Sequence, residues 1–133
     1  MFEYRVRVRY ADIDRMNVAY HSRYFEWFEA ARTELLRRTG LDYKTVEQQG
    51  IMMPVIEAHC RYMRPVHYDE MLQIRTFIKS AGRTRLRIEY GVYGEEDTRK
   101  RADGYTVHCF LTSGGQVVRA PDPLYDILRT DQK

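Results

Sequence analysis

Two carboxylates and a histidine lie directly before an apolar helical pattern in the segment YADIDRMNVAYHSRYFEWFEAAR, which covers residues 10–32. A carboxylate such as that of Asp14 can act as a general base toward water or as a nucleophile. The first turn of a helix presents unpaired backbone N–H groups and partial positive charge, which stabilise an oxyanion. Asp14 precedes His21, where the helix begins, by seven residues, so both groups can face one substrate carbonyl. The segment therefore predicts a base or nucleophile beside an anion-stabilising turn at a loop-to-helix junction.

Several residues of this segment have a second interpretation. The alternative for Asp14 is a loop carboxylate that hydrogen-bonds to its own backbone. For Asp12 two roles stay open, a structural one through backbone contacts and a chemical one. The side chain of His21 either orients water or packs locally. Tyr20 and Tyr24 either line a substrate pocket or belong to the core, since both positions are aromatic at a helix start.

The periodicity of the N-terminal third predicts one strand, a loop and a long helix. Apolar and charged side chains alternate in EYRVRVRY, residues 3–10, which is the pattern of a half-buried strand. Residues 11–21 show no sustained period and predict a loop. From Ser22 the apolar residues recur at helical spacing over about 18 residues, and Gly40 can close the helix. A shorter helical segment is expected near residues 42–49.

The rest of the chain predicts strands joined by turns. The expected strands cover residues 55–63, 71–80, 84–93, 104–112 and 116–120, and a last short helix is expected near residues 124–128. One predominantly apolar helix needs a sheet to cover it. The expected fold is therefore α+β, with a curled antiparallel sheet of five or six strands wrapped around one long central helix. We expect residues 1–133 to form a single domain.

Composition narrows the class of protein. The net charge is only +3 over 133 residues, the apolar runs fall far short of the ~20 residues of a membrane helix, and MFEYRVRV lacks a secretory apolar core. We therefore expect a cytoplasmic protein without a membrane span. Cys60 and Cys109 predict buried free thiols. His59, His67 and His108 lack the close spacing of a zinc site, so no metal is expected.

Three motifs carry a family resemblance. The pattern Y-x-D-x-D-x-M-x-V-x-Y-H-x-x-Y-x-x-x-F-E-x-A-R runs from Tyr10 to Arg32, and it is followed by CRYMRPVHYDEMLQIRT at residues 60–76 and by VVRAPD near the end. The chain resembles the hotdog-fold acyl-CoA thioesterases of the 4-hydroxybenzoyl-CoA thioesterase type. The resemblance implies a homodimer with active sites at the subunit boundary, often assembled into a homotetramer. It places the catalytic carboxylate at Asp14 and the backbone N–H that polarises the thioester carbonyl at His21.

The resemblance also implies substrate-binding residues. Arg83 matches a basic position that contacts the coenzyme A phosphates in the family, and Lys79 begins the same basic segment. Guanidinium groups bind phosphate bidentately, although a solvated strand face is the alternative interpretation of this segment. Asn17 stands where the family usually has Gly, and Asn tolerates left-handed backbone geometry. We assign Asn17 to the substrate pocket together with Tyr20 and Tyr24.

The expected activity is hydrolysis of acyl-CoA to a free acid and coenzyme A, without a redox cofactor or metal. A thioester carried by acyl carrier protein is a second possible substrate. The main alternative is a non-catalytic hotdog protein that binds acyl-CoA or acyl carrier protein. A hotdog dehydratase is another alternative, and a β protein that binds nucleic acid through exposed arginines and tyrosines is a further one. The acidic segments GEEDT and DPLYD argue against nucleic acid as a partner.

Overall fold

The computed structural model of the chain describes residues 1–41, 46, 48 and 50–130. The short helix expected near residues 42–49 thus lies outside the described residues, apart from Val46 and Gln48. The main element is a five-stranded antiparallel sheet with the order β1-β4-β5-β6-β3. Its strands are β1 (Phe2–Arg7), β3 (Val55–Tyr62), β4 (Met71–Ala81), β5 (Leu86–Gly94) and β6 (Lys100–His108). A two-stranded pairing joins β2 (Ile51–Met52) to β7 (Leu111–Thr112).

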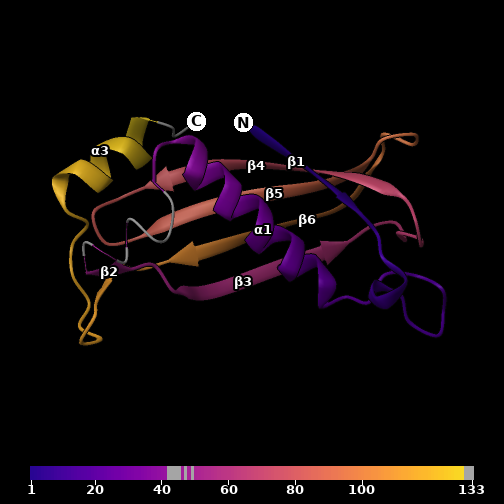
Figure 1. The fold of residues 1–133 in the computed structure, drawn as a ribbon, viewed down its shortest axis with the longest axis horizontal. Coiled ribbons are helices and arrows are strands. Elements are labelled where there is room, and N and C mark those ends of the chain that lie inside the picture. Colours follow the sequence, from indigo (N-terminus) through magenta and orange to yellow (C-terminus); the bar gives the residue numbers. More distant parts are fainter. Residues whose placement is uncertain (42–45, 47, 49, 131–133) are drawn as a thin grey trace.

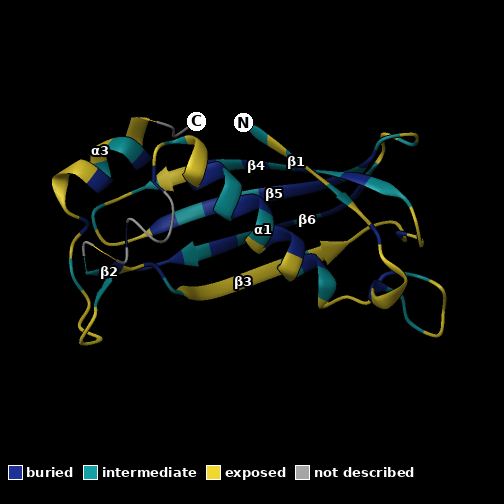
Figure 2. Ribbon diagram, viewed as in Figure 1, coloured by how far each residue is buried: buried dark blue, intermediate teal, exposed yellow. Residues whose placement is uncertain are grey.

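One long helix, α1 (Arg23–Arg38), lies across a face of this sheet (Figure 1). The ring of Phe28 on α1 stacks on Tyr90 of β5 with centroids 4.4 Å apart. Gly104 of β6 makes this close packing possible, because a Cβ there would lie 2.7 Å from the Phe28 ring. Figure 2 shows the buried residues gathered between α1 and strands β4 to β6. The expected α+β arrangement of a five-stranded antiparallel sheet and one long central helix is confirmed.

A second helix, α3 (Asp122–Thr130), covers the end of the sheet that lies opposite the loop between β1 and α1 (Figure 1). Leu124 and Leu128 are its buried residues. This helix was expected near residues 124–128, and it extends by about one half-turn at each end. Pro123 occupies the first turn, where its missing N–H leaves no bond unmade.

Several details differ from the sequence prediction. The expected strand at residues 116–120 is not formed, since only Val117 makes an isolated bridge, to Leu111. The expected strand at residues 104–112 is divided into β6, which ends at His108, and β7. Strand β1 ends at Arg7, and Tyr10 begins a 3-10 turn, Tyr10–Asp12, where it is 76% exposed. The turn forms because the Asp12 carboxylate accepts the backbone N–H of Arg9 and bends the chain. Strand β6 begins at Lys100, four residues before the expected start at 104. Ser22 precedes α1 as expected, but its side chain makes no capping hydrogen bond.

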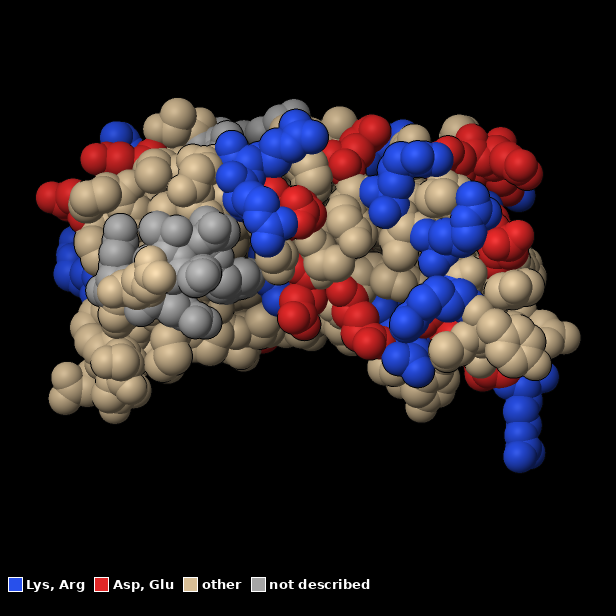
Figure 3. All heavy atoms as spheres, in the orientation of Figure 1, with Lys and Arg blue, Asp and Glu red and all other residues tan. Residues whose placement is uncertain are grey.

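The surface is mixed in charge and the sheet has an open edge. Lys and Arg lie interspersed with Asp and Glu among the described residues on the face shown in Figure 3. Strand β3 is exposed along nearly its whole length (Figure 2), and it pairs with β6 on one side only. Cys60 and Cys109 are free thiols as expected; Cys109 is buried, whereas Cys60 is only half-buried. No described helix is long and apolar enough to cross a membrane.

Candidate active site

The loop that follows β1 is anchored by Asp12, whose side chain is 1% exposed. Its carboxylate accepts the backbone N–H of Arg9 at 2.8 Å and the Arg9 guanidinium at 2.9 Å. Burial alone would raise the pKa of Asp12, but the hydrogen bonds from Arg9 and the charge of Arg23 lower it. Of the two roles left open for Asp12, the structure supports the one that holds the loop.

A tight turn fixes the position of Asp14. The Asp14 carbonyl accepts the N–H of Asn17 at 3.0 Å, and the Asp14 N–H donates to Val18 at 2.9 Å. Its Oδ1 accepts the N–H of Met16 at 2.8 Å. Asn17 has a φ of 64°, the left-handed geometry that Asn tolerates and Gly adopts freely. Asn17 therefore shapes the turn, and it does not line the cavity next to Asp14.

The start of α1 leaves backbone donors available. The N–H of Tyr20 donates to the carbonyl of Asp12 at 2.8 Å, and the N–H of Ala19 donates to Val66 at 2.8 Å, so the entry to the helix is fixed on both sides. Within the described part of the chain, the N–H groups of His21 and Ser22 have no acceptor. The His21 carbonyl accepts the Tyr62 hydroxyl at 2.9 Å.

Asp14 and His21 line one cavity of about 360 Å³ at this junction. Its walls come from the β1–α1 loop, the start of α1 and the segment after β3. The lining residues are Asp14, Val18, Ala19, His21, Tyr24, Tyr62, Met63, Arg64 and Pro65. One chain thus brings a carboxylate and a helix N-terminus to a common space, as the spacing of residues 14 and 21 predicts.

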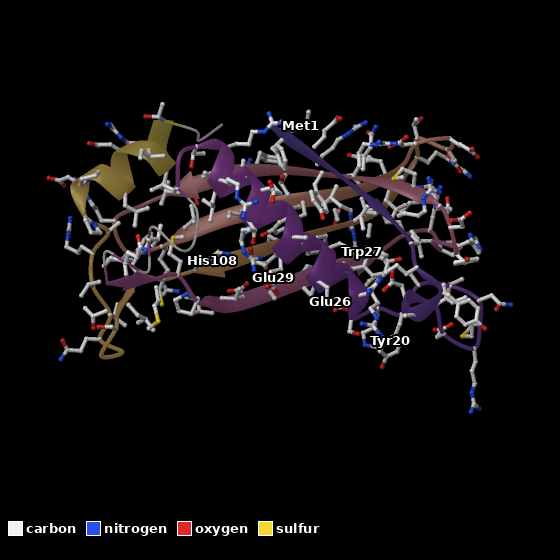
Figure 4. The ribbon with its side chains drawn as sticks, viewed as in Figure 1. Met1, Tyr20, Glu26, Trp27, Glu29 and His108 are labelled. Carbon is white, nitrogen blue, oxygen red and sulfur yellow. The ribbon has the colours of Figure 1, made fainter. Side chains whose placement is uncertain are left out.

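Two tyrosines form the aromatic wall of this cavity. Tyr24 is 3% exposed and meets Tyr62 edge-to-face with ring centroids 4.8 Å apart. Burial raises the pKa of Tyr24 to about 12, and burial together with the Cys60 thiol raises the pKa of Tyr62 above its usual range, so both stay neutral. Tyr20 is 46% exposed and contacts the His21 ring at a tilt of 53° without lining the cavity; Figure 4 labels it near the start of α1.

Tyr62, Met63 and Arg64 are site residues that were not singled out from the sequence. Tyr62 ends β3 and the other two residues follow it, about 40 residues after the helix start. The signal was present, because they belong to the CRYMRP part of the second motif. The periodic pattern of a strand does not indicate which distant residues the strand contacts, so it did not predict that these residues lie near His21.

Lys79 and Arg83 lie elsewhere in the chain. Arg83 donates to the Asp122 carboxylate at 2.6 Å and lies over the Tyr125 ring at 4.0 Å, so it docks α3. Lys79 is exposed near the end of β4. Figure 1 shows that this end of β4 and α3 lie opposite the loop between β1 and α1. A single chain therefore does not bring either cation to the Asp14 cavity.

The histidines do not form a cluster in the structure. His108 is buried at the end of β6 and bonds to Thr106 at 2.9 Å and to the Met53 carbonyl at 3.1 Å; Figure 4 labels it far from Tyr20 along the sheet. Among the described residues, no group of three or more His, Cys, Asp or Glu could hold a metal ion.

The fold and this site define a class of protein, the hotdog-fold thioesterases. Residues 8–128 match the family model described as "Thioesterase-like superfamily". The chain belongs to that superfamily, and it is a thioester hydrolase. The resemblance noted from the three motifs is thereby confirmed.

Individual relatives agree with this family. The chain is 33% identical over 98 residues to "Acyl-CoA thioester hydrolase YbgC" of Escherichia coli O6:H1, covering 74% of this chain and 73% of that protein. The crystal structure of the hypothetical protein TT1821 from Thermus thermophilus has a TM-score of 0.92 at 32% identity and 98% coverage of both chains. The DHNA-CoA thioesterase from Staphylococcus aureus has a TM-score of 0.84 at 28% identity, over 88% of this chain and 78% of that chain.

Proposed function

We propose that the protein hydrolyses acyl-CoA thioesters to free acids and coenzyme A. The main support is that Asp14 and His21 line one cavity, and that the backbone N–H of His21 has no acceptor among the described residues. Relatives whose names specify acyl-CoA or DHNA-CoA as substrate support the same chemistry. The family membership favours this activity over the non-catalytic binding protein and over a nucleic-acid-binding protein.

His21 and Asp14 have different roles in the proposed reaction. The His21 N–H donates to the thioester carbonyl oxygen and stabilises the negative charge that develops there. As general base, Asp14 takes a proton from water while the water oxygen attacks the carbonyl carbon, after which the C–S bond breaks and the thiolate takes up the proton. As nucleophile, Asp14 forms a mixed anhydride with release of the thiolate, and water then hydrolyses the anhydride. Both routes use the same placement of the carboxylate.

The acyl group occupies the aromatic side of the cavity in this proposal. Tyr24, Tyr62 and Met63 provide an apolar wall with neutral hydroxyls. Asn17 acts on this pocket through the turn that it shapes, and Tyr20 acts on it through its ring contact with His21. A thioester of acyl carrier protein would place the same acyl group on the same wall, so it is the second substrate to test.

We further propose that residues 1–133 act as one domain in a homodimer or homotetramer. The open edge of β3 carries Val55 and Ile56 with exposures of 43% and 44%, and antiparallel pairing with a second copy would cover them. In such a pair the two β3 strands run in opposite directions, so the start of one strand lies beside the end of the other. Lys79 and Arg83 of the partner subunit would thereby lie closer to the cavity. The two free thiols suit the reducing cytoplasm.

The test is release of free thiol from a panel of aliphatic, aromatic and long-chain acyl-CoA substrates. Asp14→Asn keeps an oxygen that can accept the Met16 N–H, and it should lower kcat/KM by about 100- to 10,000-fold. Asp126→Asn is the matched control, because this exposed carboxylate lies on α3. Absence of turnover by the wild type, or an Asp14→Asn variant as fast as the wild type, would overturn the proposal.

A further inference from the structure

The hydroxyl of Tyr24 differs from the other polar groups of the candidate active site. Tyr24 is 3% exposed and lines the cavity of Asp14 and His21. Its Oη atom has no hydrogen-bond partner among residues 1–41, 46, 48 and 50–130. The fully enclosed side-chain atoms without a partner in these residues are the Nε atoms of Arg23 and Arg75, so Tyr24 Oη keeps contact with open space. The hydroxyl therefore faces the cavity, and its hydrogen bond comes from water or from a bound ligand.

Packing fixes the direction of this hydroxyl. The Tyr24 ring meets Tyr62 edge-to-face with centroids 4.8 Å apart, and it packs on Trp27 with centroids 4.9 Å apart. Trp27 is itself 5% exposed and lies one turn further along α1 (Figure 4). A ring held on two sides presents its hydroxyl at a fixed place, so a hydrogen bond to it requires little ordering of the protein. Burial raises the pKa of Tyr24 to about 12, and the neutral phenol can both donate and accept.

Two other polar side chains of the cavity have partners within the chain. The Tyr62 hydroxyl donates to the His21 carbonyl at 2.9 Å. Arg64 donates through Nη1 to the Lys100 carbonyl at 2.8 Å. Tyr62 and Arg64 are also exposed, whereas Tyr24 is the buried polar residue among those that line the cavity. A buried hydroxyl that receives no hydrogen bond costs free energy, so a ligand that fills the cavity binds more tightly when it supplies one.

Tyr24 lies at the inner end of the cavity. His21, Met63 and Arg64 are exposed around the opening, whereas Tyr24 is buried. Tyr24 follows His21 by three residues, which corresponds to about 4.5 Å of helical rise. The coenzyme A carrier is larger than the cavity and charged, so in the proposed reaction it extends through the open side. When the thioester carbonyl lies between Asp14 and His21, the acyl group therefore points toward the Tyr24 hydroxyl.

We propose that Tyr24 is a specificity-determining residue, whose hydroxyl forms a hydrogen bond with an oxygen substituent of the acyl group. The substrate class is then acyl groups that carry a hydroxyl or keto oxygen, in preference to the same groups without that oxygen. An acyl group without the oxygen displaces water from the Tyr24 hydroxyl and does not replace its hydrogen bond. This inference rests on the proposed acyl-CoA hydrolysis and names the feature by which the cavity selects its substrate.

The experiment compares pairs of coenzyme A thioesters that differ by one oxygen: 3-hydroxybutanoyl with butanoyl, 3-oxobutanoyl with butanoyl, and 3- and 4-hydroxybenzoyl with benzoyl. In at least one pair, kcat/KM of the wild type should be about 5- to 100-fold higher for the acyl group with the oxygen. In Tyr24→Phe that ratio should fall to about 1, because the ring packing stays and only the hydroxyl is lost. Tyr62→Phe is the control within the cavity, since its hydroxyl bonds to His21 and its loss should affect both members of a pair equally. Tyr93→Phe on β5 is the control outside the cavity.

Thermal unfolding and calorimetry complete the test. The Tm of Tyr24→Phe should equal that of the wild type, and a fall in Tm with an unchanged substrate ratio would show that the hydroxyl serves the fold instead of the substrate. The inference is also overturned if the wild type cleaves both members of every pair equally well, although the proposed hydrolysis then stands. Calorimetric titration with the same pairs as ketone analogues, in which a methylene group separates the carbonyl from sulfur, needs no turnover. If the wild type cleaves no thioester but binds the oxygen-bearing analogue more tightly through Tyr24, the hydrolysis fails and the role of Tyr24 stands.

Discussion

Replacement of Arg101 by Met should destabilise the protein strongly, because Arg101 connects three segments near the active site. Its guanidinium binds the Glu70 carboxylate and the Pro65 carbonyl, while its side chain is only 6% exposed. Met fills a similar volume without any donor. The variant would leave Glu70 with the His67 N–H, at 2.7 Å, as its remaining described donor.

The size of the effect follows from burial. Removing one partner of a buried ion pair costs about 3–5 kcal/mol. The Glu70 side chain is 27% exposed, so water solvates part of the stranded carboxylate and the lower end of that range applies. We expect a loss of about 3 kcal/mol in the free energy of unfolding, which corresponds to a fall in Tm of about 10 °C for a domain of this size.

The assay is urea unfolding of Arg101→Met and of Arg61→Met, the matched control. Arg61 pairs with Asp103 at 3.3 Å, but its side chain is 69% exposed, so its loss should cost about 0–1 kcal/mol.

The difference in free energy of unfolding between Arg101→Met and the wild type should also depend on pH. Burial raises the pKa of Glu70, but hydrogen bonds from Arg101 and from the His67 backbone lower it below its ordinary value of 4.5. The stabilisation is therefore present above pH 4.5 and is lost as the pH falls further. If Arg101→Met unfolds at the same urea concentration as Arg61→Met, the reasoning is refuted.

Two other predictions concern Tyr62 and His108. Tyr62→Phe removes the hydroxyl that donates to the His21 carbonyl at 2.9 Å, and kcat should fall by about 2- to 10-fold at an unchanged Tm; steady-state kinetics and thermal unfolding check this, and a wild-type kcat would contradict it. Burial and the charge of Arg32 lower the pKa of His108 from 6.5 to about 4. Between pH 6.5 and about pH 4, His108 therefore binds a proton in the unfolded chain but not in the folded one. The free energy of unfolding should fall by about 3 kcal/mol as the pH drops through this range. Urea unfolding across the window should show a shallower dependence for His108→Gln, and equal slopes would exclude this role for His108.

The fold could be predicted largely because its signals are local. The helical spacing from Tyr24 to Leu35 defines α1, and the strand-like segments at residues 55–63, 71–80 and 84–93 correspond to β3, β4 and β5. The predicted end of β1 is wrong because a side-chain interaction overrides the alternating pattern. Alternation continues to Tyr10, yet the hydrogen bond between Arg9 and Asp12 turns the chain earlier. The order of strands, with β1 beside β4 and β3 at the far edge, is set by long-range pairing that no local pattern contains.

The candidate site was predictable in part for the same reason. Asp14 and His21 are close in sequence, and the cavity between them follows from one loop and one helix start. Tyr62 and Arg64 enter this site only because β3 pairs with β6 and ends beside α1. The hydrogen bond between Arg101 and Glu70 likewise joins residues that are 31 positions apart in the sequence. Such contacts are consequences of the sheet topology, so they could be identified only once the strands were assembled.

The most direct test of the account is a crystal structure with a non-hydrolysable acyl-CoA analogue, in which a methylene group separates the carbonyl from sulfur. The account predicts that the carbonyl oxygen lies about 3 Å from the backbone nitrogen of His21, within hydrogen-bonding distance. The Asp14 carboxylate should face the carbonyl carbon directly or through one water. An analogue bound with its carbonyl away from His21, or with Asp14 on the far side of the loop, would contradict the account.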